Sequence, residues 1–116
     1  MLFRSIAPGT YSPTIQRRAD YVLPLEFKDS TGTAINLTGW TVLAQVWNQA
    51  RTTKYCDFTT TYTNRAVGSV SIALDYTQTT TLPDECYYDV MLINPSNLRE
   101  YYLEGILYVS EGYTTP

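Results

Sequence analysis

The clearest alternation of apolar and polar residues runs from Ser69 to Asp75, where Val70, Ile72 and Leu74 are separated by small or polar residues. A period of two is typical of a half-buried β-strand, because successive side chains of a strand point to opposite faces. The pattern therefore predicts a strand here, with Val70, Ile72 and Leu74 in the core.

A second strand is predicted from Tyr21 to Lys28. One face of this segment is apolar and carries Tyr21, Leu23, Leu25 and Phe27. Pro24 lies on the other face, and it has no N–H to give to a ladder, so we expect an edge or bulged strand.

Further short strands are predicted at residues 34–37, 53–63, 87–93 and 101–109, the last two joined by a turn around residues 94–97. Their predicted facing sets are Tyr88, Val90 and Leu92 on one strand, and Tyr101, Leu103, Gly105, Leu107 and Val109 on the other. Residues 40–48 fit both a strand and a helix, and the β-branched residues favour a strand. Residues 76–83 indicate a loop or a single 3₁₀ turn.

Seven or eight short strands at regular spacing, with little helix, predict an all-β domain over residues 19–112, either a sandwich or a small barrel. Residues 113–116 form a short tail. Residues 1–18 show neither period and contain Pro8, Gly9 and Pro13, which predicts an extended arm. The arm is unusually apolar and carries Leu2, Phe3, Ile6, Tyr11 and Ile15. We therefore expect it to lie on a neighbouring subunit, so that its removal leaves the stability of the domain nearly unchanged.

Composition argues against most enzyme classes. The chain has 116 residues, 16% of them charged, with a formal net charge of −3 and no histidine. An acidic chain is unlike a binder of nucleic-acid phosphates, and histidine is the commonest general base and metal ligand. Glu100 and Glu104 are expected on the outward face of one strand as solvated charges. We expect no catalytic site, no cofactor, no metal and no nucleic-acid partner.

Cys56 and Cys86 are too few for a disulfide scaffold. We expect two buried free thiols, and a single bridge is the alternative. The sequence has no apolar stretch typical of a signal peptide or a membrane span, so we expect no membrane association and folding in a reducing cytoplasm.

Tyrosine is abundant, with 11 residues. Tyr87, Tyr102 and Tyr108 fall on the phase opposite the facing sets, so we expect outward rings among them. The alternative is a two-sheet core that takes rings on both phases. Exposed aromatic rings favour protein contacts, and stacking on a sugar is the second use.

Several local patterns occur in a characteristic order: Asp20–Leu25, Asp29–Gly32, Ile35–Trp40, Gly68–Leu74, Leu82–Val90 and Arg99–Ser110. This succession resembles small virion proteins of tailed bacteriophages and the N-terminal domain of phage baseplate upper proteins, over residues 19–112. The resemblance implies an immunoglobulin-like antiparallel β-sandwich with a structural role and no catalytic residues.

The resemblance also implies the partners and the location. It predicts contacts with tail, baseplate or fibre subunits in a symmetric homo- or hetero-oligomer, within a virion assembled in the host cytoplasm. The baseplate protein continues into a fibre-connecting segment, whereas this sequence stops at Pro116, so we expect a free-standing adaptor. The alternatives are a capsid decoration (cement) protein and a carbohydrate-binding module for a host glycan.

Overall fold

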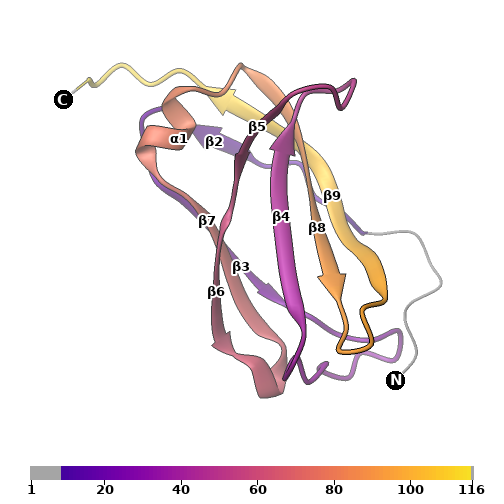
Figure 1. Ribbon diagram of the computed structural model, residues 1–116. Coiled ribbons are helices and arrows are strands. Elements are labelled where there is room, and N and C mark those ends of the chain that lie inside the picture. Colours follow the sequence, from indigo (N-terminus) through magenta and orange to yellow (C-terminus); the bar gives the residue numbers. More distant parts are fainter. Residues whose placement is uncertain (1–8, 116) are drawn as a thin grey trace.

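The computed structural model describes residues 9–115 and contains two β-sheets packed face to face (Figure 1). The larger sheet consists of β1 (Gly9–Thr10) and β2 (Thr14–Gln16), both paired with β9 (Arg99–Ser110), followed in space by β8 (Glu85–Ile93), β4 (Thr41–Trp47) and β5 (Lys54–Asp57). The smaller sheet has the order β3 (Tyr21–Glu26), β7 (Ser69–Leu74) and β6 (Thr59–Asn64). The predicted all-β sandwich is confirmed.

The strand order is that of an immunoglobulin variable-type sandwich. In that nomenclature β3, β7 and β6 correspond to strands B, E and D, and β9, β8, β4 and β5 correspond to G, F, C and C′. These pairings are antiparallel, whereas the two short strands of the arm run parallel to β9. The helix α1 (Tyr76–Thr80), the end of β2 and the C-terminal residues lie at one end of the sandwich, and the β8–β9 turn lies at the other (Figure 1).

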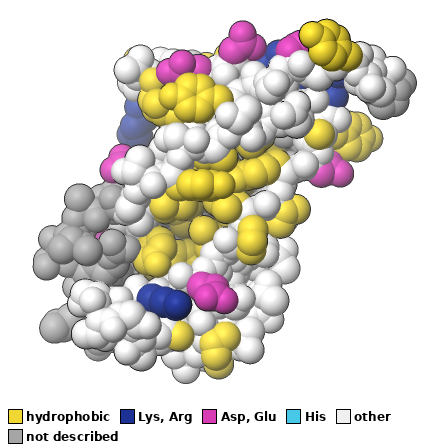
Figure 2. Space-filling model, turned by 180° about the vertical axis from the view of Figure 1, so that it is seen from behind, with side chains coloured by type: hydrophobic (Ala, Val, Ile, Leu, Met, Phe, Trp, Pro, Cys, Tyr) yellow, Lys and Arg dark blue, Asp and Glu magenta, His cyan; other side chains and the backbone are white. Residues whose placement is uncertain are grey.

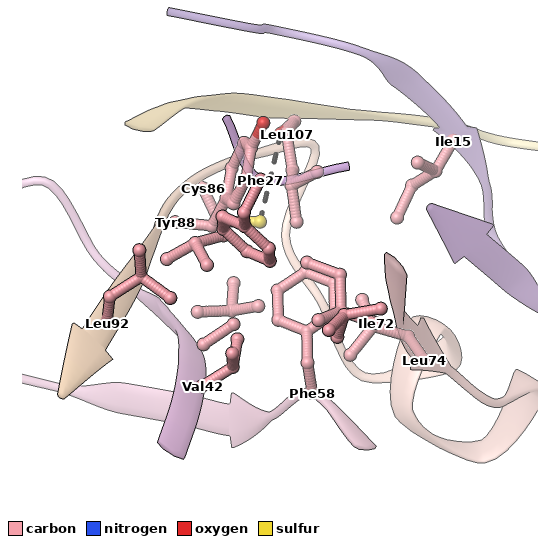
Figure 3. Packing of buried hydrophobic residues seen from close by; sticks show 14 of the residues in the cluster. Ile15, Phe27, Val42, Phe58, Ile72, Leu74, Cys86, Tyr88, Leu92 and Leu107 are labelled. Carbon is pink, nitrogen blue, oxygen red and sulfur yellow. Dashed lines mark hydrogen bonds between the residues drawn. The ribbon is translucent and has the colours of Figure 1, made fainter. Parts of the chain in front are cut away.

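The core lies between the sheets and confirms the predicted strand register of β7. Val70, Ile72 and Leu74 are all buried, as are Phe27 and Leu107. Figure 3 shows Ile72, Leu74 and Leu107 among the side chains that converge from both sheets. The Cys86 thiol donates a weak hydrogen bond to the Leu107 carbonyl oxygen at 3.7 Å. Each fully buried side chain of this size contributes about 1.5–3 kcal/mol to the free energy of unfolding.

The prediction for residues 21–28 is also confirmed. β3 pairs only with β7 in the described chain, so Pro24 lies in an edge strand, opposite Ser71. The predicted apolar face is directed inward, with Phe27 fully buried. Seen from behind, where β3 is nearest, hydrophobic side chains form a band down the middle of the molecule and charged side chains lie mostly toward its margins (Figure 2).

Three local predictions need correction. The single strand expected at residues 53–63 is broken at Phe58, whose N–H donates to the Ala44 carbonyl oxygen at 2.9 Å while the chain crosses from β5 in one sheet to β6 in the other. Residues 34–37 contribute one isolated bridge, Ala34 with Lys28, rather than a strand. Residues 76–80 form α1 because Asp75 and Gln78 make a reciprocal capping box, which the sequence-based assignment missed.

A bulge in β9 reverses the predicted faces of its first residues, up to Tyr102. Val90 lies opposite Leu103 and Met91 lies opposite Tyr101, so Tyr102 is the extra residue. Tyr102 therefore packs inward, with its ring centroid 4.5 Å from that of Phe27, and the prediction that it faces outward is wrong. Tyr101 is exposed instead.

The same bulge separates Glu100 from Glu104. Glu100 lies opposite the buried Leu92, and Glu104 lies opposite Asp89 on the outer face. The expectation that the two carboxylates share the outward face is therefore wrong.

The arm is part of its own domain over residues 9–18, which corrects the expectation that it lies on a neighbour. Ile15 is only 2% exposed and is directed into the core cluster (Figure 3). Pro13 does not interrupt the pairing, because its carbonyl oxygen accepts from the Tyr108 N–H and the Ser12 hydroxyl accepts from the Ile106 N–H. Leu2, Phe3 and Ile6 lie outside the described residues.

The end of the arm is fixed by charge. The Arg17 guanidinium donates to Glu111 at 2.5 Å, to Asp84 at 3.0 Å and to the Leu82 carbonyl oxygen at 2.9 Å. Arg18 also pairs with Glu111. These contacts join the arm to the end of β9 and to the segment that precedes β8.

Both thiols are free. Cys86 is buried and Cys56 is half-buried, and burial raises the pKa of both, that of Cys86 to about 12. Over residues 9–115 there is no helix with the length and apolar character needed to cross a membrane.

Candidate functional site: a groove on the outer face of the larger sheet

The register of the larger sheet arranges its outward side chains in rows across β4, β8 and β9. Their inward neighbours, such as Val46, Tyr88 and Leu107, are buried in the core. Three successive outward rows are Trp47–Tyr87–Ile106, then Gln45–Asp89–Glu104, then Leu43–Met91–Tyr101. A polar row with two carboxylates therefore lies between two apolar rows.

The residues of the first two rows other than Gln45 border a groove of about 420 Å³. The aromatic side chains of Trp47 and Tyr87 lie on one side of it, and Asp89 and Glu104 lie beside them. Thr10 of the arm and the β4–β5 turn complete its rim. A smaller depression of about 90 Å³ adjoins it and shares Trp47, Asp89 and Arg51 with it.

The β4–β5 turn places Arg51 over the aromatic ring of Trp47. Asn48 organises this turn, because its side-chain oxygen accepts from the Thr52 N–H at 2.8 Å and from the Thr53 N–H at 3.0 Å. Arg51 has a positive φ of 57°, and its guanidinium carbon lies 5.1 Å from the ring centroid of Trp47. This distance is that of a cation–π interaction.

Trp47 is fixed from its other side as well. Its indole Nε1–H donates to the side-chain oxygen of Gln45 at 2.9 Å. The ring is therefore held by Gln45, two residues before it on β4 and in the adjacent row, which reduces the entropy lost when a ligand packs against it.

The electrostatics of the groove are dominated by Asp89 and Glu104. They lie directly opposite each other on β8 and β9, an arrangement in which like charges repel. Neither forms an ion pair within 4 Å with any residue of the described part of the chain. Burial raises the pKa of Asp89, the charge of Arg51 opposes this shift, and the charge of Glu104 adds to it.

The residues predicted from sequence are divided between this face and other places. Tyr87 lines the groove, with its hydroxyl donating to Glu85 at 3.1 Å. Tyr108 is exposed on the same sheet face, opposite Glu85. Tyr11 is exposed on the arm, whereas Tyr102 and Ile15 are directed into the protein.

Sequence reasoning missed the other main residues of the groove, Trp47, Arg51, Asp89 and Glu104. Trp47 carried a usable signal, because it follows Leu43 and Gln45 on the phase opposite the core set of its own strand. The pairing of Asp89 with Glu104 carried none, since it depends on the bulge in β9.

No family model matches the sequence, and a search of curated proteins found no match. Within residues 9–115, no three histidine, cysteine, aspartate or glutamate side chains are placed to hold a metal ion. The groove combines aromatic surface, hydrogen-bond acceptors and uncompensated negative charge, which equips it for binding.

Proposed function

We propose that the protein is a non-catalytic structural protein of a tailed-bacteriophage virion. In this proposal it is an adaptor in the tail, baseplate or fibre-attachment region and acts through protein–protein contacts. The virion role rests on the resemblance described above, and the mode of action rests on the outer face of the larger sheet.

The observation that carries the mode of action is the apolar and aromatic content of this face. Leu43, Tyr101 and Tyr108 are each at least 40% exposed, and Trp47 and Met91 lie between them on neighbouring strands. Tyrosine, tryptophan and methionine are enriched in protein interfaces relative to other surfaces. A face carried by three long paired strands is also rigid, which lowers the entropic cost of association.

The β9 edge of this sheet is less suited to a partner. The arm pairs with β9 through β1 and β2 and so occupies the edge strand that would otherwise accept an added strand. The other edge strand, β5, has only four residues, so the face of the larger sheet offers a partner the more extensive surface.

Glycan binding is the second candidate, and the groove is the observation that favours it. Aromatic rings beside carboxylate and amide groups can stack on a sugar and accept its hydroxyl hydrogen bonds. Of the tyrosines expected to do this, Tyr87 alone lines the groove within the described chain.

The virion role is tested by locating the protein in purified particles of the phage that carries its gene. Immunogold labelling with an antibody against this chain should decorate the tail end. Labelling spread over the head would indicate a decoration protein, and absence of the protein from particles would contradict the proposal.

A further inference from the structure

We infer that the groove receives the basic side chain of a protein partner, a lysine or an arginine, with its cation between Asp89 and Glu104. This inference rests on the proposed function, because it names the chemistry of the partner at the same sheet face.

Charge complementarity favours a cation. Asp89 and Glu104 face each other without an ion pair to any described residue, and Arg51 is the single basic side chain among the described residues that line the groove. Two carboxylates and one guanidinium leave one unit of negative charge. One basic side chain from a partner neutralises this charge and relieves the repulsion between the two strands. The hydroxyl groups of a sugar would leave that repulsion in place.

The aromatic wall fits the rest of such a side chain. Lysine and arginine carry methylene stems that pack on apolar surface while the charged group meets acceptors. Trp47, Tyr87 and Ile106 form the apolar row directly beside the carboxylates. The chain itself contains an example of this contact, since Arg51 lies over the Trp47 ring.

The groove is accessible in the described chain. It opens on the outer face of the sheet, away from the core, and its volume of about 420 Å³ leaves room for residues flanking the basic side chain. The like charges that it holds reduce the stability of the unbound domain, a cost typical of a surface shaped for a ligand.

The inference is tested by nuclear magnetic resonance titration of the ¹⁵N-labelled full chain with capped Gly-Lys-Gly and Gly-Arg-Gly peptides. The matched ligand is capped Gly-norleucine-Gly, which keeps the methylenes and lacks the charge. We expect saturable shifts of the Trp47 indole N–H and of the Asp89 and Glu104 amides with a basic peptide. The uncharged peptide should bind at least about ten-fold more weakly, as expected for the loss of one partly buried charge contact.

Two variants locate the effect. The double substitution Asp89→Asn, Glu104→Gln should abolish the shifts, whereas Glu26→Gln, an exposed carboxylate of β3 on the smaller sheet, should leave them unchanged. Equal binding of the norleucine peptide, or unchanged binding by the double variant, would overturn the inference. Saturable shifts with mono- or disaccharides and none with the basic peptides would replace it with a sugar site.

The immunogold experiment tests the proposed function independently of the peptide titration. Tail labelling by immunogold, together with no response to either basic peptide, would remove the inference and leave the adaptor function in place. If the protein binds a basic peptide but is absent from particles, the proposed function fails and the assignment of the groove to a basic side chain stands.

Discussion

The hydroxyl of Tyr88 donates a hydrogen bond of 2.5 Å to the backbone carbonyl oxygen of Tyr11. This bond joins the centre of β8 to the arm across β9. It forms because Gly105 has no side chain: a Cβ at that position would lie 1.9 Å from the same carbonyl oxygen. The arm therefore packs against β9 at Gly105, where that strand has no side chain.

The first prediction concerns the absence of a side chain at Gly105. Gly105→Ala should lower the free energy of unfolding by about 1–3 kcal/mol, because the clash is with backbone that must shift. Hydrogen exchange at the Ile106 and Tyr108 amides, which donate to the arm, should accelerate in the same variant. Gly9→Ala is the control, since its added Cβ has no neighbour closer than 3.7 Å. Equal stability of the two variants in urea would show that the arm does not occupy this position.

The second prediction reverses the expectation that the arm is dispensable for folding. Ile15→Ala should cost about 2–5 kcal/mol, as for other large-to-small changes in a core. Tyr11→Ala is the comparison within the arm, because its ring is 46% exposed, and it should cost much less. A chain beginning at Ala19 should melt well below the full chain. A melting temperature within a degree of the full chain would restore the original expectation.

The third prediction concerns the two thiols. Titration of the denatured, unreduced protein should find two free groups, since neither cysteine is bridged. In the folded state, Cys86 should react with alkylating reagents far more slowly than Cys56, because it is buried and burial raises its pKa to about 12. Finding no free thiol would establish a bridge.

The fourth prediction concerns Asp89 and pH. Its pKa is raised in the folded protein, so the folded state binds a proton more readily than the unfolded state, and stability falls as pH rises through this range. This loss of stability is absent below the pKa of Asp89 in the unfolded chain, near 3.8, and is complete above the raised pKa of Asp89 in the folded protein. Asp89→Asn should therefore be more stable than the parent at pH 7.

The control for this prediction is the same comparison at pH 3, where Asp89 is protonated in both states and the difference between the variant and the parent should vanish. Thermal melts across this range supply the measurement. A variant that is less stable than the parent at pH 7 would show that Asp89 is already well compensated within the domain.

The sequence predicted those features that depend on local pattern. The alternation of Val70, Ile72 and Leu74 identified a core strand, and Pro24 identified an edge strand, because each signal lies within one short segment. The sandwich followed from the number and spacing of such segments.

The features that the sequence did not predict depend on relations between segments. One extra residue at Tyr102 placed Glu100 and Glu104 on opposite faces, and no local signal marks such a bulge. The position of the arm against β9 depends on both Gly105 and the Tyr88 hydroxyl, which are distant from the arm in the sequence. The groove exists because strand pairing brings Asp89 beside Glu104.

The proposed function requires that the outer face of the larger sheet contacts other virion proteins. The most direct measurement compares Leu43→Lys, on that face, with Val22→Lys, an exposed site on the smaller sheet; the two residues are 44% and 59% exposed. Both variants should fold, as checked by their melting temperatures, and each is supplied to a phage that lacks the gene. The account predicts that particles incorporate the Val22→Lys protein and exclude the Leu43→Lys protein. Equal incorporation of the two would contradict it.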